Sequence, residues 1–333
     1  MTRKENLMSG NFLVRVPEGG YEQSRMPTVQ YCPTCGNTVT KTWFSAPDRF
    51  HQRSPLYTLV YCTSCSLVWT NDPPPPCEMT YHYGADYHRL VNRAGETSPK
   101  RWRRHAEILT KFKSGGAVLD VGCSSGSFLA ALSGQEWNLY GIEMSSNSAE
   151  KAVARTGAKI FVGDVFDAEF EPETFDAITC FDVLEHLYQP RATLQKIWQW
   201  LKPDGVIYLF VPNIRCWESR LFGSYWYGLE LPRHLYHFSP NSLKALVGSV
   251  GFRQEFFQTP PINYVEYSTR YAITDLAGKL GFARLVLPLD SSPHLAWRGV
   301  RKLIRITALY AFSKAASLAG SGPAIEAVFR KVI

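Results

Sequence analysis

The sequence has no stretch of about 18 consecutive apolar residues, the length that a membrane-spanning helix needs. Its first twenty residues also lack an apolar core of signal-peptide length. We therefore expect a cytoplasmic protein with no transmembrane segment. With 333 residues, the chain is long enough for one large domain and a smaller appendage.

Acidic residues are in deficit, because 29 Asp and Glu stand against 36 Lys and Arg, a formal net charge of +7. Such an excess favours contact with an acidic partner: a phosphorylated substrate, nucleic acid or an anionic membrane surface. A modest excess is also common on an ordinary solvated surface. The charge alone therefore selects no partner.

Four of the eight cysteines form two CxxC pairs, Cys32 with Cys35 and Cys62 with Cys65. Two such turns complete an all-sulfur tetrahedral shell that suits structural zinc and leaves no open position for catalysis. The alternative is a CxxC redox site, which a second motif disfavours. The intervening TVTKTWF and LYTLVY are typical of short antiparallel strands. The pattern predicts a zinc ribbon over 28–76.

Other boundaries follow from composition. The run NDPPPP can be neither helix nor central strand, so it ends the ribbon. We expect a disordered or extended N-terminus over 1–27, a helical lead-in over 77–116 and the main domain over 117–333. About sixty residues, including the helical patterns of 260–320, separate the last two predicted strands.

The main domain alternates apolar runs with helical patterns, which predicts a doubly wound α/β domain with a largely parallel, Rossmann-like sheet and helices on both faces. We expect helices from about 126, from about 146 and over 191–201. The predicted strands cover 117–122, 139–143, 159–163, 175–181, 206–212, 252–259 and 324–332.

The stretch VLDVGCSSGSFL lies where such a sheet binds ligands, after its first strand. Gly122 and Gly126 let the backbone pass close to a ligand, but GxGxxG is missing, which disfavours a dinucleotide. Glu143 ends the second strand, where a carboxylate accepts hydrogen bonds from a ribose diol. Asp164 follows the third strand and can accept from an adenine amino group. A phosphate-free ligand with adenine, ribose and a zwitterionic tail satisfies these groups.

VLDVGCSSGSFL, YGIEMS, VGDVF and FDAITCFDVLEHL resemble the successive motifs of class I S-adenosylmethionine-dependent methyltransferases over roughly 100–258. The resemblance implies a seven-stranded sheet and S-adenosylmethionine as cofactor. Ser124 departs from the glycine of many members, at the expected cost of a little loop freedom. The implied cofactor residues are Asp120, Gly122 and Gly126 at the methionine moiety, Glu143 at the ribose, Asp164 and Val165 at the adenine, and Phe181 beside the cofactor.

The segment from VLEHL to PRHLYHFS is similar to the bacterial small-molecule and glycan branch of the family, including zinc-ribbon sugar C-methyltransferases and ubiquinone-type O-methyltransferases. Three histidines are candidate bases, His237 and His234 ahead of His186, although hydrogen bonding within the loop is an equal alternative for each. Tyr83 and Tyr87 stand where related enzymes place an aromatic residue against cofactor or substrate, and core packing is their alternative.

The stretch 296–320 combines basic and apolar residues, among them Arg298, Arg301, Lys302 and Arg305. A helix of this kind lies on an anionic membrane, covers a lipid-linked substrate or simply packs on the domain. Peripheral contact with the inner membrane surface through 295–318 is therefore open. So is a substrate lid that combines this insertion with 216–232.

The leading hypothesis is a methyltransferase for a sugar, glycan precursor or lipid-linked metabolite. One alternative is a zinc-ribbon RNA methyltransferase, but the ribbon is not basic, with Lys41, Arg49 and Arg53 against Asp48. The aromatic and proline signature of base methylation is also replaced by CFDV. The other alternative is a catalytically silent protein that binds the cofactor.

Overall fold

A computed structural model describes residues 8–9, 12–14, 31–51, 53–84, 98–262, 264–280 and 308–332. Its larger sheet has nine strands in the order β1-β2-β8-β7-β6-β9-β10-β13-β12. These strands are β1 (Met8–Ser9), β2 (Phe12–Val14), β6 (Gly116–Val121), β7 (Trp137–Glu143), β8 (Lys159–Val162), β9 (Phe175–Phe181), β10 (Leu201–Pro212), β12 (Phe252–Gln258) and β13 (Ala324–Lys331).

The seven strands from β8 to β12 in this order are those that the sequence predicts. β8, β7, β6, β9 and β10 are parallel, while β13 runs antiparallel between β10 and β12. Two short strands from the N-terminal segment extend the sheet beyond these seven. β2 pairs in parallel with β8, the outermost of the seven on that side. The strand order reverses at β6, which has β7 on one side and β9 on the other. Ligands of doubly wound sheets bind at such a switch point.

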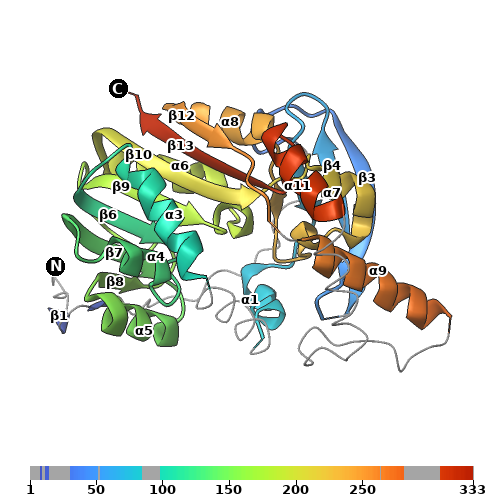
Figure 1. The fold of residues 1–333 in the computed structure, drawn as a ribbon, viewed down its shortest axis with the longest axis horizontal. Helices are drawn as coiled ribbons and strands as arrows, with labels where there is room; N and C mark the ends of the chain where they lie inside the picture. Colours follow the sequence, from blue (N-terminus) through green and yellow to red (C-terminus); the bar gives the residue numbers. More distant parts are fainter. Residues whose placement is uncertain are drawn as a thin grey trace, which may run out of the picture.

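Helices cover both faces of this sheet (Figure 1). α3 (Pro99–Thr110), α4 (Ser127–Leu132) and α5 (Ser146–Thr156) pack on the face to which Val118 points. α6 (Pro190–Trp200) and α8 (Pro240–Gly248) pack on the opposite face, to which Leu119 points. Successive strand residues point to opposite faces, so two helical layers explain why the parallel strands are almost continuously apolar.

The smaller sheet has the order β11-β5-β4-β3 and contains the two cysteine pairs at the turns of its strands. Its strands are β3 (Thr40–Asp48), β4 (Arg53–Cys62), β5 (Val68–Asn71) and β11 (Tyr236–His237). β11 comes from the main domain, in a segment that the sequence analysis treated as a loop. The ribbon also shares a buried cluster with the segment after β10, including Trp226 and Leu229. Ribbon and main domain therefore share both a sheet and a core.

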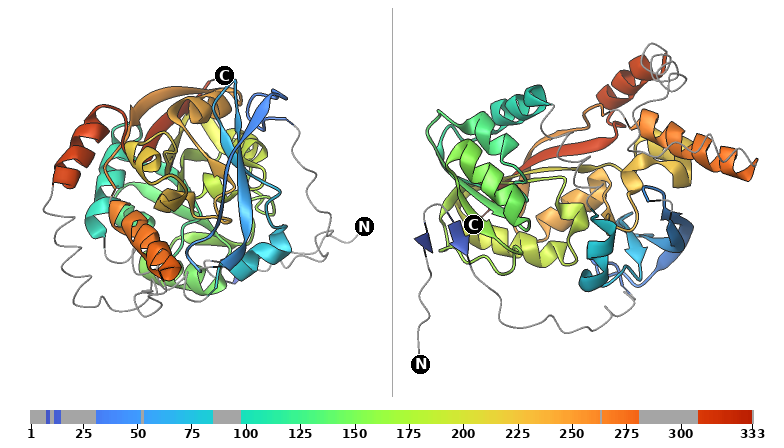
Figure 2. Two further views of the ribbon diagram at one scale, coloured as in Figure 1. Left: turned by 90° about the vertical axis from the view of Figure 1, so that its right-hand side faces the viewer. Right: turned by 90° about the horizontal axis from the view of Figure 1, so that it is seen from below.

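Short helices fill the connections around the ribbon. The lead-in contains α1 (Pro76–Met79) and η1 (Thr80–His82), and the segment after β10 contains α7 (Trp217–Phe222), η3 (Gly223–Tyr225) and η4 (Tyr227–Leu229). Between β12 and β13 lie α9 (Val265–Lys279) and α11 (Ala308–Leu318), which project from the sheet in Figure 2.

Within the described ranges, no helix is long and apolar enough to cross a membrane. The four basic residues of the predicted amphipathic helix, at 298, 301, 302 and 305, lie outside the described residues, as does Tyr87.

We predict that Gly141→Ala destabilises the fold by about 1–3 kcal/mol, because a buried core has no room for an added methyl group. Gly141 lies in β7, and a Cβ there would stand 2.6 Å from Cys123 Sγ and 2.7 Å from Ile160 Cδ1. Gly248→Ala is the matched control, since nothing lies within 4 Å of its added Cβ at the end of α8. Urea unfolding should leave this control within about 1 kcal/mol of the parent. Equal midpoints for both variants would contradict the described packing.

Candidate active site

The loop after β6 depends on glycine. Gly122 and Gly126 have φ values of 72° and 73°, in the left-handed region. A Cβ on Gly122 would stand 2.5 Å from Val183 Cγ2, and one on Gly126 would stand 2.9 Å from Ala152 Cα. Both side chains would therefore collide with neighbouring segments. Glycine at both positions therefore lets the loop pack closely at the carboxyl end of β6 and begin α4 there, and we call this loop the glycine cradle.

Ser124 is more constrained than the sequence suggested. Its φ of 48° lies in the left-handed region, which costs a non-glycine residue about 1–2 kcal/mol. Its amide donates a hydrogen bond of 2.9 Å to Oε2 of Glu143, which offsets part of this cost. The serine therefore strains the loop, where the sequence analysis expected only reduced freedom.

The Glu143 carboxylate is oriented by two backbone amides. Oε2 accepts from Ser124, and Oε1 accepts from the Ser145 amide at 2.9 Å. A carboxylate oxygen can accept two hydrogen bonds, which is the chemistry that the hydroxyls of a ribose require. The loop amides therefore hold the acid in place at the end of β7, where the sequence predicted a ribose contact.

The other predicted cofactor residues lie near the carboxyl ends of the same parallel strands. Asp120 is buried and accepts a hydrogen bond of 2.6 Å from Thr179, while burial raises its pKa to about 7. Asp164 follows β8, accepts from the Phe166 amide at 2.8 Å, and has its pKa raised by burial, with Val165 buried beside it. Phe181 ends β9 and stacks on the His105 ring at 4.8 Å. Acidic acceptors and a glycine cradle fit a ligand that has hydroxyl and amino donors.

His186 lies just after β9, in η2 (Leu184–His186), and is partly exposed. Its Nδ1 stands 3.1 Å from the backbone oxygen of Arg233 and 2.9 Å from the Tyr83 hydroxyl. The tyrosine hydroxyl can donate or accept, but a carbonyl oxygen can only accept, so we assign the proton to Nδ1 and the lone pair to Nε2 from the Arg233 contact. Burial, helped by the positive charge of His234, lowers the pKa of His186 to about 3. This imidazole is therefore neutral near pH 7.

His234 has the opposite protonation state. Its Nδ1 stands 2.9 Å from the backbone oxygen of Gly228, and its Nε2 stands 2.9 Å from a carboxylate oxygen of Glu230. Both partners only accept, so both nitrogens carry protons and the ring is an imidazolium. Burial works against the charge, but the Glu230 hydrogen bond prevails and raises the pKa of His234. The rings of His234 and His186 lie 4.6 Å apart, edge to face.

His237 lies beyond this pair, in β11. It is 2% exposed, is paired with Val68 of the ribbon, and has a ring centroid 6.4 Å from that of His234. Burial lowers its pKa well below the usual range. Its Nε2 is buried without a hydrogen-bond partner among the described residues. The structure thus groups His186 and His234 and places His237 on the ribbon side.

Several polar residues of this region were not singled out from the sequence. Arg101 of α3 forms an ion pair of 2.6 Å with Asp182, which has a φ of 56° directly after β9. Glu185 is 1% exposed, its carboxylate has no hydrogen bond within the described ranges, and burial raises its pKa to about 8. Its carboxylate lies within 4.8 Å of a nitrogen of both His186 and His234. Glu185 lies in VLEHL and Asp182 directly precedes it, so acidic residues next to a candidate histidine were the sequence signal for these two.

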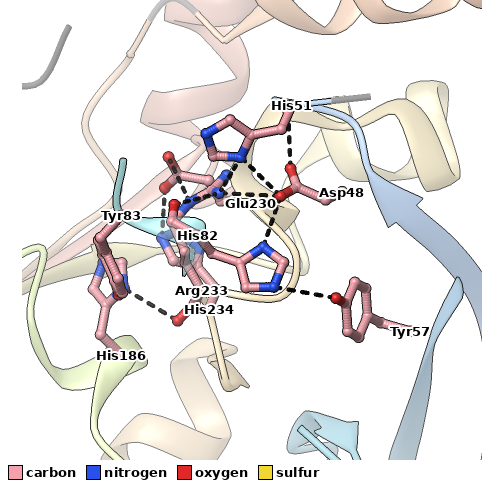
Figure 3. A network of polar contacts seen from close by, with 9 residues as sticks. All are labelled: Asp48, His51, Tyr57, His82, Tyr83, His186, Glu230, Arg233 and His234. Atoms are coloured by element: carbon pink, nitrogen blue, oxygen red, sulfur yellow. Dashed lines mark hydrogen bonds and ion pairs between the residues drawn. The ribbon is translucent and has the colours of Figure 1, made fainter. Parts of the chain in front are cut away.

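Arg233 joins the two histidines to the ribbon (Figure 3). The arginine is fully buried, and its Nη1 lies 3.5 Å from Oδ2 of Asp48, at the end of β3. That oxygen also accepts hydrogen bonds of 2.9 Å from His51 and His82. On its other side, Arg233 Nε lies 3.8 Å from Glu230. The positive charge of Arg233 lowers the pKa of Asp48 against the effect of burial.

The four cysteines of the ribbon converge. Their sulfur atoms all lie within 4.8 Å of one another, with Cys32 and Cys65 at 3.4 Å and Cys35 and Cys62 at 3.5 Å. Tetrahedral zinc with bonds of about 2.3 Å needs sulfurs about 3.8 Å apart, so the donor set and spacing fit this ion. The prediction that the two CxxC turns bring their four sulfur atoms together is confirmed.

Parts of the chain are similar to known proteins. Residues 90–255 match the family described as "Methyltransferase domain". The ubiquinone biosynthesis O-methyltransferase of Pasteurella multocida (strain Pm70) is 31% identical over 137 residues, 36% of this chain and 57% of that protein. The protein of the same name from Aliivibrio fischeri (strain MJ11) is 32% identical over 114 residues, 32% of this chain and 48% of that protein. The chain thus spans about half the length of these curated relatives.

One solved structure has a similar fold. It is a chain from the complex of the Haloferax volcanii Trm112 methyltransferase activator with a protein described as a methyltransferase, with 16% sequence identity and a TM-score of 0.51. The match covers 74% of this chain and 97% of that one. At this identity the likeness shows the fold alone, which agrees with the doubly wound sheet described above.

We predict that Glu230→Gln lowers the pKa of His234, because the variant removes the charge that favours the imidazolium. Titration of histidine-labelled protein by NMR measures this directly. The raised pKa means that the imidazolium stabilises the fold below the unfolded-state pKa of about 6.5, and that this contribution is lost as pH rises through the folded-state value. Glu255→Gln, on the surface of β12, is the matched control. A His234 pKa that is the same in parent and Glu230→Gln would contradict the assigned network.

Proposed function

We propose that this chain, whose residues 90–255 belong to the methyltransferase domain family, transfers the methyl group of S-adenosylmethionine to a small-molecule acceptor. The observation that carries the proposal is the cradle after β6. It combines two left-handed glycines with a glutamate oriented by two amides, at the switch point of the sheet. These groups are matched to a ribose and an amino acid tail, and they lack the phosphate-binding pattern of a dinucleotide site.

The cofactor residues follow from this placement. We assign the methionine moiety to the loop of Asp120, Gly122 and Gly126, the ribose to Glu143, and the adenine to Asp164 and Val165. Phe181 and Tyr83 border the site from β9 and from the lead-in. When bound, S-adenosylmethionine supplies a methyl group already activated on a sulfonium, so the protein chiefly aligns the acceptor and receives its proton.

We assign the proton acceptor to His186. Its Nε2 holds the lone pair, whereas both nitrogens of His234 carry protons and His237 is buried in a strand of the ribbon sheet. This order differs from the sequence analysis, which placed His237 and His234 first. A base with a pKa near 3 is weak, so alignment of the acceptor would contribute more to the rate than removal of its proton.

The acceptor is a small molecule in this proposal, within the class of sugars, glycan precursors and lipid-linked metabolites. The relatives named ubiquinone biosynthesis O-methyltransferase support oxygen as the acceptor atom. Peripheral membrane contact through 295–318 belongs to the same proposal, since a lipid-linked acceptor would be reached from the membrane surface.

The second part of the proposal is a structural zinc ion in the ribbon. Cys32, Cys35, Cys62 and Cys65 would hold it as thiolates, which fills the coordination shell with protein ligands. The ion would then stabilise the turns of the ribbon and take no part in methyl transfer.

We predict that calorimetric titration detects binding of S-adenosylmethionine and none of NAD. Glu143→Ala should weaken this binding at least tenfold, because it removes the acceptor of the ribose hydroxyls and the partner of two loop amides. Glu136→Ala is the control, since this glutamate lies at the other end of β7. No binding of S-adenosylmethionine to the parent, or no effect of Glu143→Ala, would contradict the assignment.

We also predict about one zinc ion per chain by elemental analysis of the purified protein. Cys35→Ser should lose this metal and lower the melting temperature, because a tetrahedral thiolate shell needs all four sulfurs. Cys77→Ser is the matched control, as this exposed cysteine lies outside the cluster. Full zinc content in Cys35→Ser, or a metal-free parent, would exclude the zinc ribbon.

A further inference from the structure

We propose that Asp48 of the ribbon is a positioning residue for methyl transfer, which it serves by anchoring Arg233 and thereby fixing the tautomer of His186. This inference rests on the function proposed above. It extends that function by giving the ribbon a role at the reacting centre, at a distance from the cysteine cluster. Figure 3 shows the chain of contacts, from Asp48 on the ribbon through Arg233 to the histidine pair.

The first step is the anchoring of a buried charge. Arg233 is 0% exposed, so its guanidinium requires counter-charges inside the protein. Two carboxylates lie within ion-pair distance in the described ranges, Asp48 at 3.5 Å and Glu230 at 3.8 Å. Nη1 also donates a hydrogen bond of 3.2 Å to the backbone oxygen of His82. The ribbon and the lead-in therefore determine where this side chain lies.

The second step leads from the side chain of Arg233 to its backbone. The carbonyl oxygen of this same residue lies 3.1 Å from Nδ1 of His186. Because a carbonyl only accepts, it holds the proton on Nδ1 and keeps the lone pair of Nε2 available. A shift of the Arg233 backbone would leave the Tyr83 hydroxyl as the contact of Nδ1, and because this hydroxyl can donate as well as accept, the imidazole could change tautomer. The tautomer with the proton on Nε2 could not accept a proton there.

The third step concerns the neighbouring cation. Glu230 lies between Arg233 and His234, and its hydrogen bond keeps His234 protonated. If Asp48 is neutral, Glu230 is the carboxylate that remains within ion-pair distance of Arg233 among the described residues. Glu230 would then be drawn from His234 towards Arg233, which changes the surroundings of both His234 and His186. Asp48 is hydrogen-bonded by His51 and His82 and is 0% exposed, so its carboxylate is held in place beside Arg233.

The test is Asp48→Asn in the full-length chain, a change that keeps the shape and removes the charge. We expect at least a tenfold fall in kcat with an S-adenosylmethionine KM within twofold of the parent and unchanged zinc content. In ¹⁵N-histidine NMR, the parent should show a single Nδ1–H tautomer for His186, and Asp48→Asn a mixture. His186→Gln provides the reference for complete loss of the base. Asp275→Asn, on α9, is the control for loss of one carboxylate.

A second variant covers the case in which Asp48→Asn does not fold. Asp48→Asn combined with Arg233→Met removes both charges, so no unpaired ion remains buried. We expect this folded double variant to retain zinc and S-adenosylmethionine binding but to keep the low kcat and the mixed tautomer. Parent kcat in either variant, or a single Nδ1–H tautomer in both, would overturn the proposal. The tautomer measurement needs no turnover, so it decides the positioning role even if the parent transfers no methyl group.

Discussion

A single buried charge, that of Arg233, constrains the organisation of this protein. Removing one partner of a buried ion pair costs about 3–5 kcal/mol, because the remaining charge is left uncompensated. The compensation for Arg233 comes from Asp48 on the ribbon and from Glu230 next to the histidines. The ribbon, the loop before β11 and the histidine pair therefore have to assemble together. An arginine in this position makes the ribbon part of the candidate active site.

The strand pairing reinforces this coupling. β11 follows directly after the segment that contains Arg233 and His234, which we call the histidine loop. It forms the fourth strand of the ribbon sheet. The Leu235 amide donates to the backbone oxygen of Glu185, and the Thr70 hydroxyl donates to that of His234. The loop is thus fixed between the end of β9 and the ribbon by backbone contacts as well as by charge. A small sheet that looks like an appendage in the sequence gives the histidine loop its shape.

The doubly wound sheet and the cysteine cluster could be predicted from the sequence because each depends on local pattern. Apolar runs of strand length alternate with helical periods, and CxxC turns have a spacing that suits one metal. Glu143 could be placed because strand ends share an edge of a parallel sheet. The strain at Ser124 was underestimated, since φ depends on the contacts of the folded loop.

The protonation states of the histidines could not be predicted from sequence. His186 and His234 belong to distant segments and have the same reference pKa, and only their surroundings in the fold lower the pKa of His186 and raise that of His234. The link from Asp48 to Arg233 joins positions 48 and 233, for which no local pattern exists. Long-range pairing of this kind is decided by packing, which also brought β11 into the ribbon sheet.

The central claim is that ribbon, histidine loop and cofactor cradle form one reaction site. The most direct measurement is a crystal structure with S-adenosylhomocysteine, recorded at the zinc absorption edge. Our account predicts zinc at the four cysteines and Nε2 of His186 within about 8 Å of the ligand sulfur, which leaves room for one acceptor atom between them. A sulfur more than about 12 Å from His186, or a ligand bound away from Glu143, would contradict it.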